Sequence, residues 1–207
     1  MNKLYDYLFL NKEYPFKHKW FNSFVIKSKE KIDFSDIMNE LLGHVEIVVD
    51  RDNTIVCYFE DLDFAIEDVI LSISDDFGIS ITSFKMPKLY VNEHKFLPLY
   101  NLYNKYLPNR SRFFYTSELI EEAINKDLGD ARALKELLLG NLLKDSINAL
   151  VINGIFENDL NVLKTSKSIY MHRNTINNKI NLIKKETSLN ILKFKDAVVL
   201  YFLINLK

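Results

Sequence analysis

The hydrophobic pattern changes its period along the chain. Up to about residue 125, short apolar or alternating runs, which predict strands, take turns with runs at helical spacing. From Gly129 onward only helical spacing remains. The pattern predicts an α+β protein, in which an α/β sandwich with an antiparallel sheet is followed by an all-helical domain. We expect an N-terminal extension over residues 1–17, a first domain over 18–128 and a second over 129–207.

In the first domain the predicted elements follow the order β-α-β-β-α-β, which is typical of a ferredoxin-like arrangement. Two predicted strands flank the polar run from Asp50 to Asn53 and should form a hairpin. The alternation from Ile79 to Phe84 indicates a half-buried strand, and Gly78 should end the helix before it. Strands are expected over 20–26, 45–49, 54–59, 79–84 and 112–115, and helices over 34–42, 64–77, 96–106 and 117–125.

In the second domain we expect helices over 131–143, 144–155, 162–169, 173–187 and 194–206. A soft break is expected at Asn153 and Gly154. The helix over 144–155 should carry one apolar stripe made of Ile147, Leu150, Val151 and Ile155. Asn161 should cap the next helix, whose inward residues should be Val162, Ser166 and Ile169.

The composition is that of a soluble globular protein, because 48% of the 207 residues are hydrophobic and 27% are charged. No run reaches the ~18 apolar residues of a membrane span, and the N-terminus lacks the order of a signal peptide. We therefore expect no membrane partner and a cytoplasmic location. The one cysteine, Cys57, lies in a predicted strand and reads as a reduced core residue.

The sequence gives no sign of catalysis. It has five glycines and no glycine-rich phosphate loop. The carboxylates Glu60, Asp61 and Asp63 precede a predicted helix, where capping and solvation explain them better than a metal does. We expect no catalytic residue, no metal and no cofactor.

The net charge of -1 hides an asymmetry. Between Leu41 and Tyr90 there are ten acidic residues and three basic ones. Between Leu160 and Lys207 there are nine basic residues and two acidic ones. Two differently solvated surfaces could produce such a split, but the basic end favours double-stranded DNA as a partner.

The predicted helix over 173–187 has two chemically different faces. Ile176, Ile180 and Ile183 share an apolar side. The opposite side carries amides and ammonium groups, with no acid before Glu186, whereas a solvated helix face usually mixes the two charges. Asparagine can pair with the adenine edge, and lysine or arginine can neutralise phosphates. The outward residues are Asn174, Asn178, Asn181 and Lys185, with Asn177 at the flank.

This helix would be the recognition helix of a helix-turn-helix. Arg173 should contact a phosphate or a guanine edge. Asn174, Asn177 and Asn181 should face bases, and the lysines should position the DNA backbone. The predicted DNA-binding residues are Lys164, Lys167, His172, Arg173, Asn174, Thr175, Asn177, Asn178, Asn181, Lys184 and Lys185.

Several short motifs resemble the C-terminal helix-turn-helix of PucR/CdaR-type transcriptional regulators. They are Ile155-Phe156-Glu157-Asn158, Thr165-Ser166, Ile169-Tyr170-Met171-His172-Arg173-Asn174-Thr175-Ile176, Lys179-Ile180 and Ile183. The chain departs from that family where Ser166 replaces alanine, Asn178-Lys179 replaces Tyr-Arg and Ser188 replaces glycine. The second departure changes groups expected near the DNA, so the resemblance implies no operator preference.

In that family a domain resembling a degenerate diguanylate cyclase, the GGDEF-like domain, often precedes the helix-turn-helix. The hairpin from Val45 to Phe59 would be its signature hairpin. Its turn lacks Gly-Gly-Asp/Glu-Glu-Phe, so the resemblance implies no cyclase activity.

The leading hypothesis is a DNA-binding transcriptional regulator that acts as a homodimer, with a small-molecule effector as a candidate further partner. One alternative is a protein-interaction or small-ligand-binding module that has lost DNA binding. Another is an enzyme built on the first domain, which would need titratable groups that converge in a pocket.

Overall fold

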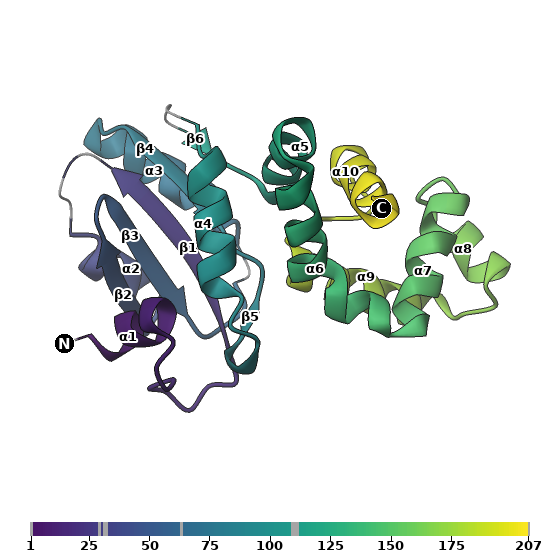
Figure 1. Ribbon diagram of the computed structural model, residues 1–207, viewed down its shortest axis with the longest axis horizontal. Helices are drawn as coiled ribbons and strands as arrows, with labels where there is room; N and C mark the ends of the chain where they lie inside the picture. The colour runs from purple at the N-terminus through teal and green to yellow at the C-terminus, as the bar shows by residue number, and fades with distance from the viewer. Residues whose placement is uncertain (1, 29, 31–32, 63, 109–111, 207) are drawn as a thin grey trace. The chain divides into compact units, whose positions relative to one another are not determined.

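The chain divides into two compact units, Met1–Tyr115 and Thr116–Lys207, in a computed structural model. The structure describes residues 2–28, 30, 33–62, 64–108 and 112–206, so the carboxylate of Asp63 lies outside it. The first unit combines helices with a six-stranded sheet and the second is helical (Figure 1). The α+β prediction is confirmed.

The sheet of the first unit has the strand order β2-β3-β1-β4-β6, with β5 paired to β1 outside this path. Strand β1 runs antiparallel to β3 and β4, β2 runs antiparallel to β3, and β6 runs parallel to β4. The four strands β4-β1-β3-β2 have the ferredoxin-like order. The strands are β1 Trp20–Ser28, β2 Val45–Asp50, β3 Asn53–Tyr58, β4 Ile81–Lys85, β5 Leu89–Tyr90 and β6 Arg112–Phe113.

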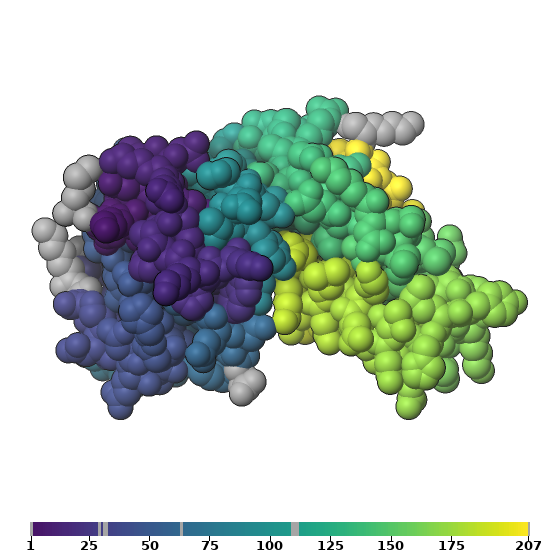
Figure 2. Space-filling view, turned by 90° about the horizontal axis from the view of Figure 1, so that it is seen from below, coloured from purple at the N-terminus to yellow at the C-terminus, as the bar shows by residue number. Residues whose placement is uncertain are grey.

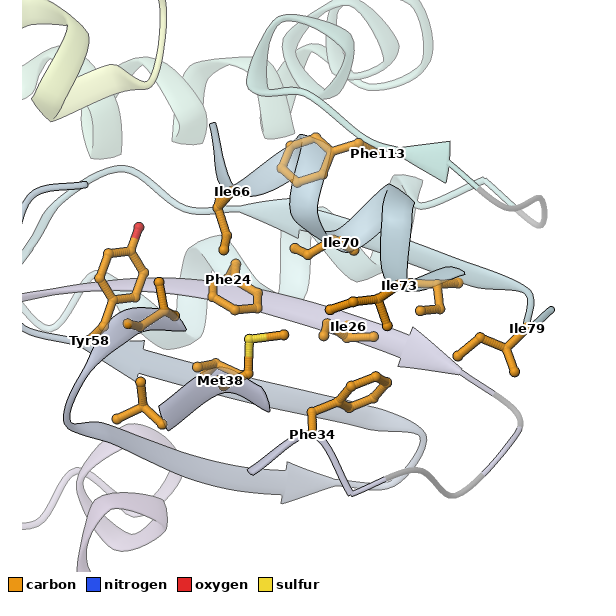
Figure 3. Close-up of a cluster of buried hydrophobic side chains, with 14 residues drawn as sticks. Phe24, Ile26, Phe34, Met38, Tyr58, Ile66, Ile70, Ile73, Ile79 and Phe113 are labelled. Carbon is orange, nitrogen blue, oxygen red and sulfur yellow. The ribbon is translucent and has the colours of Figure 1, made fainter. Parts of the chain in front are cut away.

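Helices cover both faces of this sheet (Figure 1). Behind it, α2 and α3 close a core that includes Phe24, Met38 and Ile70 (Figure 3). In front, the ring of Tyr103 on α4 stacks on Phe84 with the ring centroids 4.4 Å apart. The helices are α1 Lys3–Leu10, α2 Ser35–Leu42, α3 Ile66–Phe77 and α4 Phe96–Tyr106, with a 3-10 turn at Val91–Glu93.

Two expectations change because helices cover both faces of the sheet. Strand β4 is buried on both sides, so the prediction of a half-buried strand is wrong, and Ser83 is buried like Phe84. The expected extension contains α1, whose Leu4, Tyr7 and Leu8 are buried.

The hairpin prediction is confirmed, since β2 and β3 pair from Val45↔Tyr58 to Asp50↔Asn53. Gly78, at φ 63°, ends α3 as expected.

The helical unit begins earlier than the pattern suggested. Helix α5 packs on α6 and α10, so the units divide after Tyr115, whereas the sequence prediction placed the division after residue 128. The side chains of Asp127, Asp145 and Asn161 cap α6, α7 and α8. The helices are α5 Thr116–Lys126, α6 Leu128–Lys144, α7 Ser146–Glu157, α8 Val162–Ser168, α9 Arg173–Thr187 and α10 Phe194–Asn205.

Helix α7 corrects two predictions. It runs without a break through Asn153 and Gly154. Ile147 and Leu150 are exposed, and Asn148 and Ile152 lie in the buried face instead, beside Val151 and Ile155. The predicted apolar face of α7 is rotated from the observed buried one by roughly one residue position. The reason is that apolar residues lie all around this helix, so the sequence alone does not show which side is buried.

None of the helices in the described part of the chain combines the length and the apolar character that a membrane crossing requires.

Candidate nucleic-acid interface

Helices α8 and α9 form a helix-turn-helix. The turn contains Tyr170, which is left-handed at φ 51°, and the amide of Met171 donates to the carbonyl of Ser166 at 3.1 Å. Asn161 Oδ1 accepts from the amides of Leu163 and Lys164, both at 3.0 Å. The predicted cap is confirmed.

The close packing of α7 against α8 depends on Gly154 and Thr165. A Cβ atom at Gly154 would lie 3.0 Å from Ile169 Cγ2 and 3.1 Å from Thr165 Cγ2. Thr165 is fully buried, and its Oγ1 lies 3.2 Å from the carbonyl oxygen of Gly154 and 2.9 Å from that of Asn161. Ser166, which was expected to allow the close crossing, is half-buried, so that assignment was wrong and glycine has this role.

The inner face of α9 is the predicted one. Ile176 and Ile183 are fully buried and Ile180 is 6% exposed. Thr187 extends this face by one turn, and Ser188 ends the helix at φ 58°, with its amide donating to the carbonyl of Lys184 at 2.8 Å. The isoleucine face therefore fixes which side of α9 can meet a partner.

The outer face of α9 is open. Atoms in the green to yellow-green part of the colour range, which includes α8 and α9, reach the surface in the space-filling view (Figure 2). All predicted contact residues are exposed. Several of their side chains make no hydrogen bond or ion pair with another described residue: Lys167, Arg173, Asn174, Asn177, Asn178, Asn181 and Lys184. These donors and acceptors are available to a ligand outside the chain.

Some of the predicted contact residues also have a role inside the protein. The ring of His172 caps α9, since Nδ1 accepts from the amide of Asn174 at 3.2 Å. Lys164 pairs with Asp159 at 3.0 Å, with both side chains largely exposed. Lys184 lies in the last turn of α9, where an ammonium group is favoured by the helix dipole even without DNA. Arg173 is different, because it lies at the positive end of the dipole with no acid in that turn.

Lys179 does not lie where the resemblance implied. Its Nζ is 3.0 Å from Asp145 Oδ2, and its side chain is 22% exposed. The hydrogen bond from Lys179 holds the pKa of the Asp145 carboxyl below its usual value. Asn178 belongs to the outer face, whereas Lys179 is bound within the protein, so only the first of these two departures changes the exposed surface.

Other chemistry is sparse. Cys57 is fully buried, and burial raises the pKa of its thiol, as expected for a core residue. Among the described residues, no group of three histidine, cysteine or acidic side chains is placed to hold a metal. The first unit has a hollow of about 630 Å³ that lies between the start of α2 and the β2–β3 turn, lined by residues that include Asp33, Phe34, Ile47, Arg51 and Asp52.

A comparison with known protein families identifies the C-terminal part of the helical unit. Residues 151–206 match the family described as the PucR C-terminal helix-turn-helix domain. They are a PucR-type helix-turn-helix domain. The matched region contains α8, α9 and α10.

A solved structure is also similar over most of the chain. It is the regulator of polyketide synthase expression from Bifidobacterium adolescentis, with 14% identity, a TM-score of 0.43, and coverage of 93% of this chain and 82% of that one. No curated protein matches this chain.

Proposed function

We propose that the chain is a DNA-binding transcriptional regulator that reads the major groove with α9. The observation that carries the proposal is a set of exposed side chains on α9 that have no hydrogen-bond or ion-pair partner among the described residues: Arg173, Asn174, Asn177, Asn178, Asn181 and Lys184. Asn174, Asn177 and Asn181 read base edges, and Arg173 contacts a phosphate or a guanine. The contact surface is completed by Lys164, Lys167, Lys184 and Lys185, together with His172, Thr175 and Asn178.

The regulator acts in the cytoplasm. It acts as a homodimer, because helix-turn-helix proteins commonly read two half-sites one turn of DNA apart. Helix α10 supports association, since it exposes Phe194 (78%), Tyr201 (51%) and Phe202 (59%) on the side opposite its buried residues. Large apolar side chains exposed along one side of a helix are a feature of interaction sites. Sedimentation of the full chain should give a dimer, and replacing Phe194 and Phe202 by serine should give a monomer.

The sheet unit has the sensing or association role and no catalytic activity. As part of this proposal, the sheet unit is a degenerate GGDEF-like domain. The hollow beside the β2–β3 turn supports a small-molecule effector as a further partner.

The test of DNA binding uses a duplex that the wild-type chain selects from a random library. Arg173→Ala and Asn177→Ala should each weaken binding by about 1–3 kcal/mol if they read bases. If Arg173 contacts a phosphate, the slope of log affinity against log salt should also fall by about 0.9. Asn101→Ala, at an exposed position of α4, is the matched control and should change nothing. Wild-type affinity for both variants at several salt concentrations would show that the contact assignment is wrong.

The alternative function is a small-ligand or protein-binding module without DNA binding. The same hollow is the observation that favours it. Retention on heparin separates the two: a DNA-binding face should hold the chain to moderate salt, whereas elution at low salt favours the alternative.

A further inference from the structure

One ion pair joins the proposed recognition helix to the start of another helix. Lys179 Nζ on α9 lies 3.0 Å from Oδ2 of Asp145, the N-cap residue of α7. The other carboxylate oxygen, Oδ1, accepts from the amide of Ile147 at 2.8 Å. The carboxylate is therefore fixed by the backbone of α7, and it holds the ammonium of Lys179 in turn.

Lys179 lies at the border between the two faces of α9. It is 22% exposed, beside the buried Ile176 and Ile183, and its ammonium points to α7 and away from the asparagine side. The isoleucine face sets which side of α9 is inside, but apolar burial is non-directional and permits some rotation of the helix about its axis. A charge-assisted hydrogen bond is directional and restricts that rotation.

We propose that the Asp145–Lys179 pair positions the recognition helix by fixing its rotation, and so sets which asparagines meet the base edges. This inference rests on the proposed function. Lys179 is a positioning residue and makes no contact with DNA itself.

The experiment compares Asp145→Asn, Lys179→Met and the double variant. Asparagine can still cap α7, and methionine keeps most of the apolar stem of lysine, so each change mainly removes the ion pair. Affinity is measured for the duplex selected by the wild-type chain and for an unrelated duplex of equal length. Each measurement is repeated at several salt concentrations.

Each single variant should lower affinity for the selected duplex by about three- to fivefold, the range that a partly exposed ion pair supports. The double variant should be no weaker than either single one, because both remove the same interaction. Affinity for the unrelated duplex and the salt slope should stay as in the wild type. Lys179→Arg, which can keep the pair, should retain wild-type affinity. The matched control is the exposed pair of Glu122 and Lys126 on α5, where Glu122→Gln should have no effect.

The opposite pattern would overturn the inference. If Lys179 contacts a phosphate, Lys179→Met lowers the salt slope by about 0.9, and Asp145→Asn releases the ammonium and tightens binding. Wild-type affinity in both single variants would also overturn it, since the pair would then be merely structural. If the wild-type chain selects no duplex at all, the proposed function fails first, which is a different result from a bound duplex that ignores Asp145→Asn.

Discussion

Two polar regions of the molecule use their side chains in opposite ways. At the β2–β3 turn, Tyr100 of α4 donates to Asp50 Oδ2 at 2.8 Å and accepts from Asn53 Nδ2 at 2.6 Å. Asn53 also donates to Asn104 at 3.1 Å. On α9 the asparagines of the outer face make no such bond within the described residues. The first region uses most of its polar groups to join α4 to the hairpin, and the second leaves its polar groups exposed.

The difference shows that a row of polar residues in a sequence has no fixed meaning. In the sequence, Asp50 and Asn53 belong to the polar run of a predicted hairpin turn, and in the structure they also take part in a partly buried network. Substitutions at the turn should change stability and leave DNA binding intact. Substitutions on the outer face of α9 should do the reverse. Four predictions test or sharpen this contrast.

The largest effect is expected at the packing that holds α8 and α9 in place. Gly154→Leu should lower the free energy of unfolding by about 1–3 kcal/mol or more, because its side chain would enter space held by Ile169 and Thr165. Chemical denaturation measures this. Gly140→Leu on α6 is the control, since a Cβ there meets the flexible side chain of Glu136, and the helix should gain up to about 1 kcal/mol. Equal effects at both glycines would contradict the close packing.

Removing one hydroxyl from the turn network should have the next largest effect. Tyr100→Phe should cost about 1–2 kcal/mol, since Asp50 loses a donor and Asn53 loses an acceptor in a partly buried site. Affinity for the selected duplex, measured well below the unfolding temperature, should not change. Tyr5→Phe, which keeps the ring that stacks on Phe9, is the control and should be close to neutral. A loss of DNA affinity in Tyr100→Phe alone would break the contrast between the two regions.

The cap of α9 connects the two kinds of effect. His172→Ala should cost about 1 kcal/mol, because the amide of Asn174 loses its acceptor. His172→Asn should recover most of this stability, since asparagine is a good cap. DNA affinity separates the roles of the residue: if His172 only caps, His172→Asn binds as the wild type does, and a persistent loss indicates a contact with DNA.

The smallest effect is a gain. Ser188 has φ 58°, a conformation that glycine adopts without steric cost, so Ser188→Gly should raise stability by about 0.5–1 kcal/mol. Thermal unfolding measures the shift. Ser72→Gly, in the interior of α3, should have the opposite sign by a similar amount. A loss at both positions would show that the serine side chain at 188 matters more than its backbone.

Local signals in the sequence predicted much of the molecule. The isoleucine face of α9, the cap at Asn161 and the end of α3 at Gly78 each depend on residues close together in the chain. The predictions that were wrong concern features that depend on contacts between segments far apart in the chain. The burial of Phe84 depends on α4, and the division after Tyr115 depends on the packing of α5 against α6 and α10. Gly154 could have been recognised as a packing position, since a glycine in an apolar helix often marks a close approach.

Residues close together in the chain are enough to predict the order of the elements, the two faces of α9 and the concentration of basic residues at one end, because periodicity and charge are properties of neighbouring residues. The tertiary structure decided which polar groups find partners. Lys135 donates to the carbonyls of Ile204 and Leu206, and Lys179 is bound to Asp145, 34 residues away, while Asn177 and Asn181 stay exposed. A lysine in a sequence can serve either purpose, and only the fold brings a distant carboxylate or carbonyl within hydrogen-bonding distance of it.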